Sequence, residues 1–143
     1  MNKKNRRFCI ITEGYPDEGR PIYTFVKNIV DALADIGNEC TVISPFSING
    51  YKTFHKQIET YTTANGNIVK VYRPNILTFS NWNIMGFKPS CYMFEKAVNR
   101  VLNKLEHKPD VIYGHFWRNA IHAYKYAHKN NIPLIVDNTF GAG

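Results

Sequence analysis

The residues best suited to chemistry in this sequence come directly after apolar segments. His115 and Arg118 follow the apolar stretch "DVIYG". A histidine can hydrogen-bond a sugar hydroxyl or act as a base, and an arginine can hold a phosphate or carboxylate. We therefore predict that His115 is a catalytic residue. A histidine whose ring is satisfied by a backbone carbonyl is the alternative.

A second candidate is the stretch "TEGYPDEGRPIYTF", residues 12–25. Its two glycines can adopt positive φ and leave room for a ligand, and the N–H groups of the helix expected to begin near Pro21 favour anions. The spacing is neither GxGxxG nor a P-loop, so a plain strand-to-helix turn is the alternative. The predicted substrate-binding residues are Gly14, Gly19, Arg20, Tyr23 and Arg118.

Alternating strand and helix patterns are expected to position these residues. Short apolar runs at 7–12 and 39–44 are typical of buried parallel strands, and the segment between them has helical spacing from Pro21 to Gly37. Downstream we expect a hairpin about Ala64–Asn67, an aromatic loop with a short helical piece at 75–90, helices at 92–107 and 118–131, and strands at 110–116 and 132–138.

This order predicts an α/β fold with a doubly wound, mainly parallel sheet. Ligands of such folds bind at the carboxyl ends of the strands, near the point where the strand order reverses. The two candidate stretches above each follow a predicted strand, so both are expected at that edge of the sheet. We expect residues 1–143 to form a single domain.

Composition and charge narrow the function classes. The net charge of +7 favours anionic partners, but the lysines are expected on the solvent sides of helices, so we predict no nucleic-acid binding. The histidines and the three cysteines lack metal-ligand spacing, and we predict no metal. Without a disulfide pattern, a signal peptide or a spanning segment, the sequence predicts a cytoplasmic protein.

The aromatic loop has two interpretations. Trp82, Phe87 and Tyr92, together with Lys88, could stack on a sugar or touch lipid. A partly buried loop that packs on the sheet is the alternative.

Two long segments resemble the N-terminal half of GT-B glycosyltransferases of family 4. They are "RFCIITEGYPDEGRPIYTFVKNIVDALADIGNECTVISP" and "KPDVIYGHFWRNAIHAYKYAHKNNIPLIV", and they cover about two-thirds of the chain. The resemblance implies a Rossmann-like acceptor-binding domain whose first glycine loop faces the cleft between two domains. It places His115 near the reacting centre. Tyr113 stands where the family has another histidine, and Arg20-Pro21 stands where it has a second glycine.

The resemblance also implies a function. It implies transfer of a hexosyl group, with retention, from a nucleotide-sugar to a sugar or lipid-linked acceptor, with no cofactor besides that donor. The family binds the donor mainly in a C-terminal domain with an EX7E motif, which this chain lacks. We therefore expect a fragment of a longer enzyme, inactive alone, with more strands after Val136. The charge permits peripheral contact with the inner membrane face.

Two other hypotheses stay open at this point. The chain could be a stand-alone α/β module that binds a nucleotide, a phosphorylated ligand or a catalytic partner subunit. The tail "VDNTFGAG" also resembles a segment of pyridoxal-phosphate enzymes, in which Asp137 would pair with the pyridine nitrogen. No Schiff-base lysine motif accompanies it.

Overall fold

The computed structural model describes residues 5–17, 21–48, 57–79 and 83–138. These residues form a six-stranded sheet in the order β4-β5-β2-β1-β7-β8, in which only β4 is antiparallel. The strands are β1 (Arg7–Ile11), β2 (Glu39–Ile43), β4 (Ile58–Thr62), β5 (Ile68–Tyr72), β7 (Val111–His115) and β8 (Leu134–Asp137). A two-stranded parallel pair, β3 (Phe46–Ser47) and β6 (Asn75–Ile76), extends beyond β2 and β5. The predicted doubly wound, mainly parallel sheet is confirmed.

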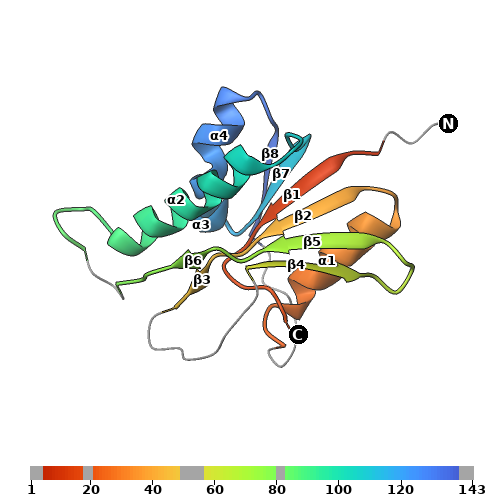
Figure 1. Cartoon of the computed structure of the whole chain (residues 1–143). Coiled ribbons are helices and arrows are strands. Elements are labelled where there is room, and N and C mark those ends of the chain that lie inside the picture. Colours follow the sequence, from red (N-terminus) through yellow and green to blue (C-terminus); the bar gives the residue numbers. More distant parts are fainter. Residues whose placement is uncertain (1–4, 18–20, 49–56, 80–82, 139–143) are drawn as a thin grey trace.

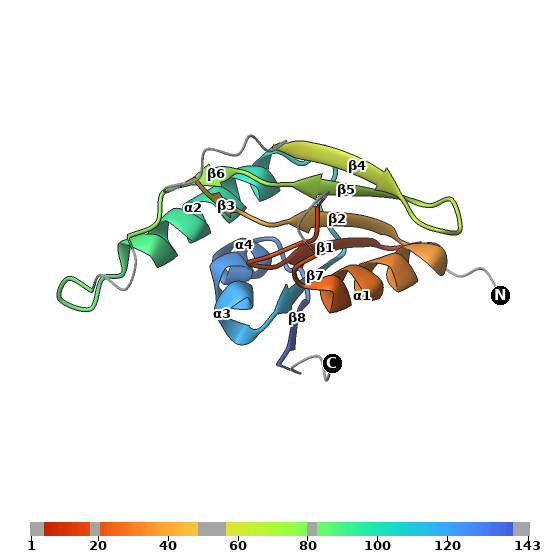
Figure 2. The ribbon, with the colours of Figure 1, turned by 90° about the horizontal axis from the view of Figure 1, so that it is seen from below.

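Helices cover both faces of this sheet, as Figures 1 and 2 show. Helix α1 (Thr24–Asp35) packs on one face, against alternate residues of β1, β2 and β5. Helices α2 (Pro89–Lys104) and α4 (Tyr124–Lys129) pack on the other face. Because side chains alternate along a strand, Ile10 faces α1 while its neighbours Cys9 and Ile11 face α2 and α4. This explains the continuous apolar runs of the sequence.

Helix α1 begins later than the sequence pattern predicted. Pro21 lies outside the helix, which starts at Thr24. The reason is Tyr23, whose φ of 54° places it in the left-handed region, so the helix begins only beyond it. At the other end Gly37 (φ 102°) donates its N–H to the carbonyl of Ala34 at 3.0 Å, which confirms the predicted stop.

The predicted hairpin forms between β4 and β5. Gly66 takes a φ of 87° in the turn, and the N–H of Thr63 bonds the carbonyl of Asn67 at 2.7 Å. The side chains of Thr63 and Asn67 also donate to Asp35 Oδ1 at 2.6 and 2.8 Å. These bonds lower the pKa of Asp35 and fasten the hairpin to the end of α1.

Two predicted helical segments differ from the structure. The continuous helix expected at 118–131 is broken into α3 (Trp117–Ala120), a 3-10 turn (Ile121–Ala123) and α4. One cause is Asn99 of α2, whose amide donates to the carbonyl of His122 at 3.0 Å and so binds an acceptor that a regular helix would use itself. The short helical piece expected within 75–90 is not found in 75–79 or 83–88, where the structure has β6 and a tight turn.

Candidate functional site

The strand order reverses at β1. The chain runs from β1 to β2 on one side and later returns to β7 on the other, so the carboxyl ends of β1 and β7 flank the switch point. Residues that follow these two strands meet there. Arg118 of α3 places Nη2 2.6 Å from Oε1 of Glu13, which follows β1. Tyr23, at the start of α1, donates its hydroxyl to the same oxygen at 2.8 Å. We call Glu13, Tyr23 and Arg118 the switch-point triad.

Gly14 has a packing role in this cluster. A Cβ on Gly14 would lie 2.3 Å from Cδ2 of Tyr23, so the tyrosine ring occupies the space beside the glycine. Thr12 fixes the loop by donating its hydroxyl to the carbonyl of Gly14 at 2.9 Å. Burial of Tyr23, reinforced by its bond to Glu13, raises its phenol pKa to about 12, so its hydroxyl stays a donor at neutral pH.

His115 ends β7 and lies beside the triad, but its side chain is fully buried, with 0% exposed. Its ring packs against Phe25 of α1, with centroids 4.9 Å apart, and against Phe116 at 4.1 Å. Neither ring nitrogen has a hydrogen-bond partner among the described residues. Burial lowers the pKa of His115, and the nearby carboxylates of Asp137 and Glu13 oppose the shift. The imidazole is therefore held neutral at pH 7.

Two aromatic residues close to His115, Phe116 and Tyr23, have strained backbone conformations. Phe116 has φ 65° and ψ 146°, a conformation that is rare outside glycine. Its N–H is held by the carbonyl of Asp137 at 2.7 Å. Tyr23 is the second aromatic residue at positive φ near the site. Such strain costs on the order of 1–3 kcal/mol per residue and clusters at functional sites.

The carboxyl end of β8 completes the site. Asp137 pairs with His115 in the parallel register of β7 and β8. Its Oδ2 accepts a hydrogen bond from the hydroxyl of Tyr113 at 2.6 Å, and burial together with this bond raises the phenol pKa. The carboxylate of Asp137 is thus held toward the sheet by Tyr113.

A cavity of about 180 Å³ opens next to the triad, lined in part by Glu13, Gly14, Ser44 and Arg73. Arg73 follows β5 at the same edge and is only 2% exposed. Its guanidinium donates to Oε2 of Glu59 at 2.8 Å and to the carbonyl of Pro16 at 3.0 Å, while Nε has no partner among the described residues.

Sequence reasoning missed Arg73, because its strand was read only as half of a hairpin. Reading that strand as parallel to β2 would have placed its last residues at the ligand-binding edge. The signal was present in the apolar alternation of "IVKVY".

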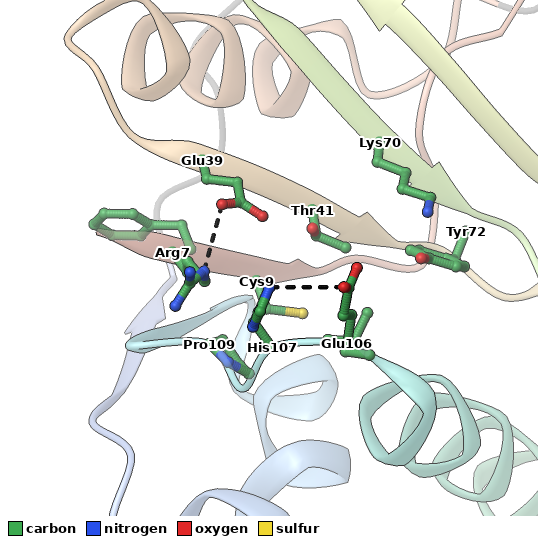
Figure 3. Close-up of a pocket in the computed structure, with 11 residues that line it drawn as sticks. Arg7, Cys9, Glu39, Thr41, Lys70, Tyr72, Glu106, His107 and Pro109 are labelled. Carbon is green, nitrogen blue, oxygen red and sulfur yellow. Dashed lines mark ion pairs between the residues drawn. The ribbon is translucent and has the colours of Figure 1, made fainter. Parts of the chain in front are cut away.

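A second cavity, of about 110 Å³, lies at the opposite, amino edge (Figure 3). Four of its ionisable side chains lie in pairs and are largely exposed. Arg7 lies 3.4 Å from Glu39, with 43% and 64% of their side chains exposed, and His107 lies 4.0 Å from Glu106. Arg7 Nε is shielded and has no hydrogen-bond partner among the described residues, but the Arg7 side chain is 43% exposed and ion-paired with Glu39. None of the residues that line this cavity has a positive φ, so we place the candidate site at the carboxyl edge.

The predicted site residues fall into two groups. His115, Gly14, Tyr23 and Arg118 lie together at the switch point. Gly19 and Arg20 lie outside the described residues, as does Trp82. Within the described ranges, no three histidine, cysteine or acidic residues gather as a metal site. No helix in those ranges is long and apolar enough to span a bilayer.

Comparison with known proteins supports the fold. The chain is similar to the solved structure of sucrose-phosphate synthase (tll1590) from Thermosynechococcus elongatus, with a TM-score of 0.57 and 11% sequence identity. The match covers 92% of this chain and 32% of that one, so the chain spans about a third of the length of its neighbour. No family model and no curated protein sequence matches the chain. The chain has the Rossmann-like fold of a GT-B half domain, as the resemblance implied.

Proposed function

We propose that this chain is the acceptor-side half of a GT-B sugar transferase. The observation that carries the proposal is the switch-point triad beside an unpartnered, buried His115, in a fold similar to a glycosyltransferase over 92% of the chain. Family 4 membership rests on the quoted sequence segments. In this proposal the enzyme transfers a hexosyl group, with retention, from a nucleotide-sugar bound mainly by a second domain.

The triad suits recognition of a sugar. Both hydrogen bonds to Glu13 use Oε1, which leaves Oε2 to accept a bond from a sugar hydroxyl. The side chain of Arg118 is 61% exposed and can also reach a phosphate on the acceptor. The cavity beside the triad, with the hydroxyl of Ser44 and the buried Arg73, offers further polar groups.

His115 is the catalytic residue of the proposal. A neutral imidazole with two unpartnered nitrogens can donate to one hydroxyl and accept from another. Contact requires displacement of the Phe25 or Phe116 ring that covers it. In this proposal Phe116 is the ring that moves, because a change in its strained backbone conformation would relieve strain.

The direct test is His115→Ala in the complete gene product that carries this chain. We expect kcat to fall about 100-fold, a typical loss for a positioned acid or base, and this loss should be much larger than the loss of folding stability from the cavity that the ring leaves. His107→Ala, at the amino edge, is the matched control and should leave kcat unchanged. Unaltered kinetics of His115→Ala would show that the histidine has only a structural role.

The isolated chain tests whether the acceptor site and the donor site lie in different domains. The purified 143-residue chain should transfer no sugar from any nucleotide-sugar, because the proposal places the donor site in the other domain. For the same reason it should bind nucleoside diphosphates no better than free phosphate, as measured by calorimetry. Tight nucleotide binding would instead favour a stand-alone nucleotide-binding module, and turnover would overturn the division of roles.

A further inference from the structure

A tight turn before α2 presents apolar side chains to solvent. Ile84 and Phe87 exchange backbone hydrogen bonds of 2.8 and 2.9 Å around Met85 and Gly86, whose φ values are 51° and 86°. Asn83 Oδ1 accepts the N–H of Gly86 at 2.9 Å. Two consecutive positive φ angles define a hairpin turn that normally takes Asn-Gly. Methionine in the first position is therefore unfavourable for folding, and this suggests another role for it.

The exposure of Met85 and its apolar neighbours indicates a role in binding. Met85 is fully exposed, and about half of the side chains of Ile84, Phe87 and Tyr92 is exposed as well. We call these four residues the apolar tip. The rings of Phe87 and Tyr92 lie 5.8 Å apart, so the tip is continuous with the first turn of α2. In Figure 2 the green segment that precedes α2 extends away from the sheet.

A row of cations continues from the tip along α2. Lys88, Lys96, Arg100 and Lys104 recur every four residues with Tyr92 in the same series, and all are exposed. Residues four apart are neighbours on a helix surface. Within the part of the chain that the structure describes, none of these four cations pairs with an acid. We call them the basic row.

We propose that the apolar tip and the basic row dock this domain on an anionic lipid bilayer. Apolar side chains that enter the interface next to lysines and arginines that meet lipid headgroups are the combination that holds peripheral proteins on membranes. The two residues at the point of the tip, Ile84 and the fully exposed Met85, are aliphatic and offer no ring on which a nucleic-acid base could stack, which favours acyl chains. Charge complementarity selects an anionic leaflet over a neutral one.

The apolar tip lies at the carboxyl edge of the sheet, where the candidate site lies. The chain leaves the carboxyl ends of β5 and β6, forms the tip and returns to the amino end of β7 through α2. The tip therefore extends from the same edge as the switch-point triad, and a docked domain would hold that edge near the lipid headgroups. The proposal does not depend on sugar transfer, and its test uses no enzymatic readout.

The test is flotation of the full chain with extruded vesicles of equal parts phosphatidylcholine and phosphatidylglycerol. We expect binding to these vesicles, loss of binding in high salt, and no binding to pure phosphatidylcholine. Met85→Asn should weaken partitioning about tenfold, because it removes the inserted side chain. Asparagine suits the left-handed turn, so this variant should fold at least as well as the parent. The charge reversal Lys96→Glu/Arg100→Glu should weaken binding by at least as much.

Two control variants test whether binding depends on the apolar tip and the basic row or only on the net charge and hydrophobicity of the chain. Ile36→Asn changes an exposed isoleucine at the end of α1, and Lys125→Glu/Lys129→Glu makes the same charge change on α4. Both should bind like the parent chain. Equal losses in variants and controls would overturn the proposal in favour of unspecific charge attraction. Failure of the parent chain to float with the anionic vesicles would overturn it outright, even if the basic row bound heparin or a protein.

Discussion

The two edges of the sheet carry similar residue types but hold them in different ways. At the amino edge Arg7, Glu39 and His107 keep about half or more of their side chains exposed, although Arg7 Nε itself is shielded and has no hydrogen-bond partner among the described residues. At the carboxyl edge Arg73 and His115 are buried, and each has a nitrogen without a partner among the described residues. Buried polar groups without partners lower stability. Arg73 and His115 bear this cost in full because their side chains are buried, whereas Arg7 stays partly exposed.

The strained backbone follows the same division, because Asn131, at positive φ before the amino end of β8, is of a residue type that tolerates the left-handed region. Tyr23 and Phe116, the aromatic residues at positive φ near the site, both lie at the carboxyl edge, next to the ends of β1 and β7. Local strain of this kind persists where the surroundings fix it and where function uses it. The comparison can be tested by matched substitutions at the two edges.

The largest expected difference is between the two arginines. Arg73→Ala removes a buried guanidinium that joins Glu59 to the carbonyl of Pro16, and we expect a loss of about 3 kcal/mol in the free energy of unfolding. Arg7→Ala breaks an exposed pair and should cost less than about 1 kcal/mol. Urea denaturation of both variants measures the contrast. Equal losses would show that the edges do not differ in this respect.

A smaller effect of opposite sign is expected at His115. Replacing it by leucine removes two buried nitrogens that have no partners, so His115→Leu should stabilise the isolated chain by about 1 kcal/mol. His107→Leu, which changes a half-exposed ring at the amino edge, should shift stability by less than about 0.5 kcal/mol. A destabilised His115→Leu variant would mean that the ring nitrogens do contribute to folding.

The pH dependence of stability provides an independent check on His115. Burial lowers the pKa of His115 below its ordinary 6.5, so below about pH 6.5 the unfolded chain takes up a proton that the folded chain resists. Stability is therefore full above that pH and falls as the pH drops. The pKa of His122 is also lowered by burial and contributes in the same direction. In the His115→Leu variant the free energy of unfolding should fall less steeply as the pH drops. An unchanged dependence on pH would show that His115 is not one of the groups that cause it.

An effect as small as that of His115→Leu, but of opposite sign, is expected from the triad. Tyr23→Phe removes the bond to Glu13 but keeps the ring beside Gly14, so we expect a loss of about 1 kcal/mol in thermal or urea unfolding. Tyr124→Phe, on the exposed side of α4, should have no measurable effect. If the two variants behave alike, the hydroxyl of Tyr23 contributes nothing to the cluster.

The strands and helices that hold the core were predictable from the sequence. Apolar runs such as "RFCII" and "ECTVI" become parallel strands, because only a sheet covered on both faces buries every side chain in the run. The edge at which His115 lies was predictable for the same reason: a residue that follows a parallel strand lies at the carboxyl edge.

Contacts between distant segments were not predictable. Glu13 and Arg118 are 105 residues apart in the sequence, and no local sequence pattern predicts that they pair. The burial of His115 depends on rings from α1 and from Phe116. The break at residue 121 depends on Asn99 of another helix. The sequence pattern also indicated an earlier start for α1, because Pro21 favours a first helical turn while the conformation of Tyr23 depends on its packing beside Gly14.

The most direct test of the account is an NMR titration of the ¹⁵N-labelled chain with a panel of hexoses, hexose phosphates and nucleoside diphosphates at millimolar concentration. We predict that a sugar or sugar phosphate shifts the amide signals of Glu13, Gly14 and Arg118, at the carboxyl edge, and that the nucleotides shift none of them. Shifts centred on Arg7, Glu39 and His107 at the amino edge, or no shift at the carboxyl edge with any sugar of the panel, would contradict the proposed acceptor site.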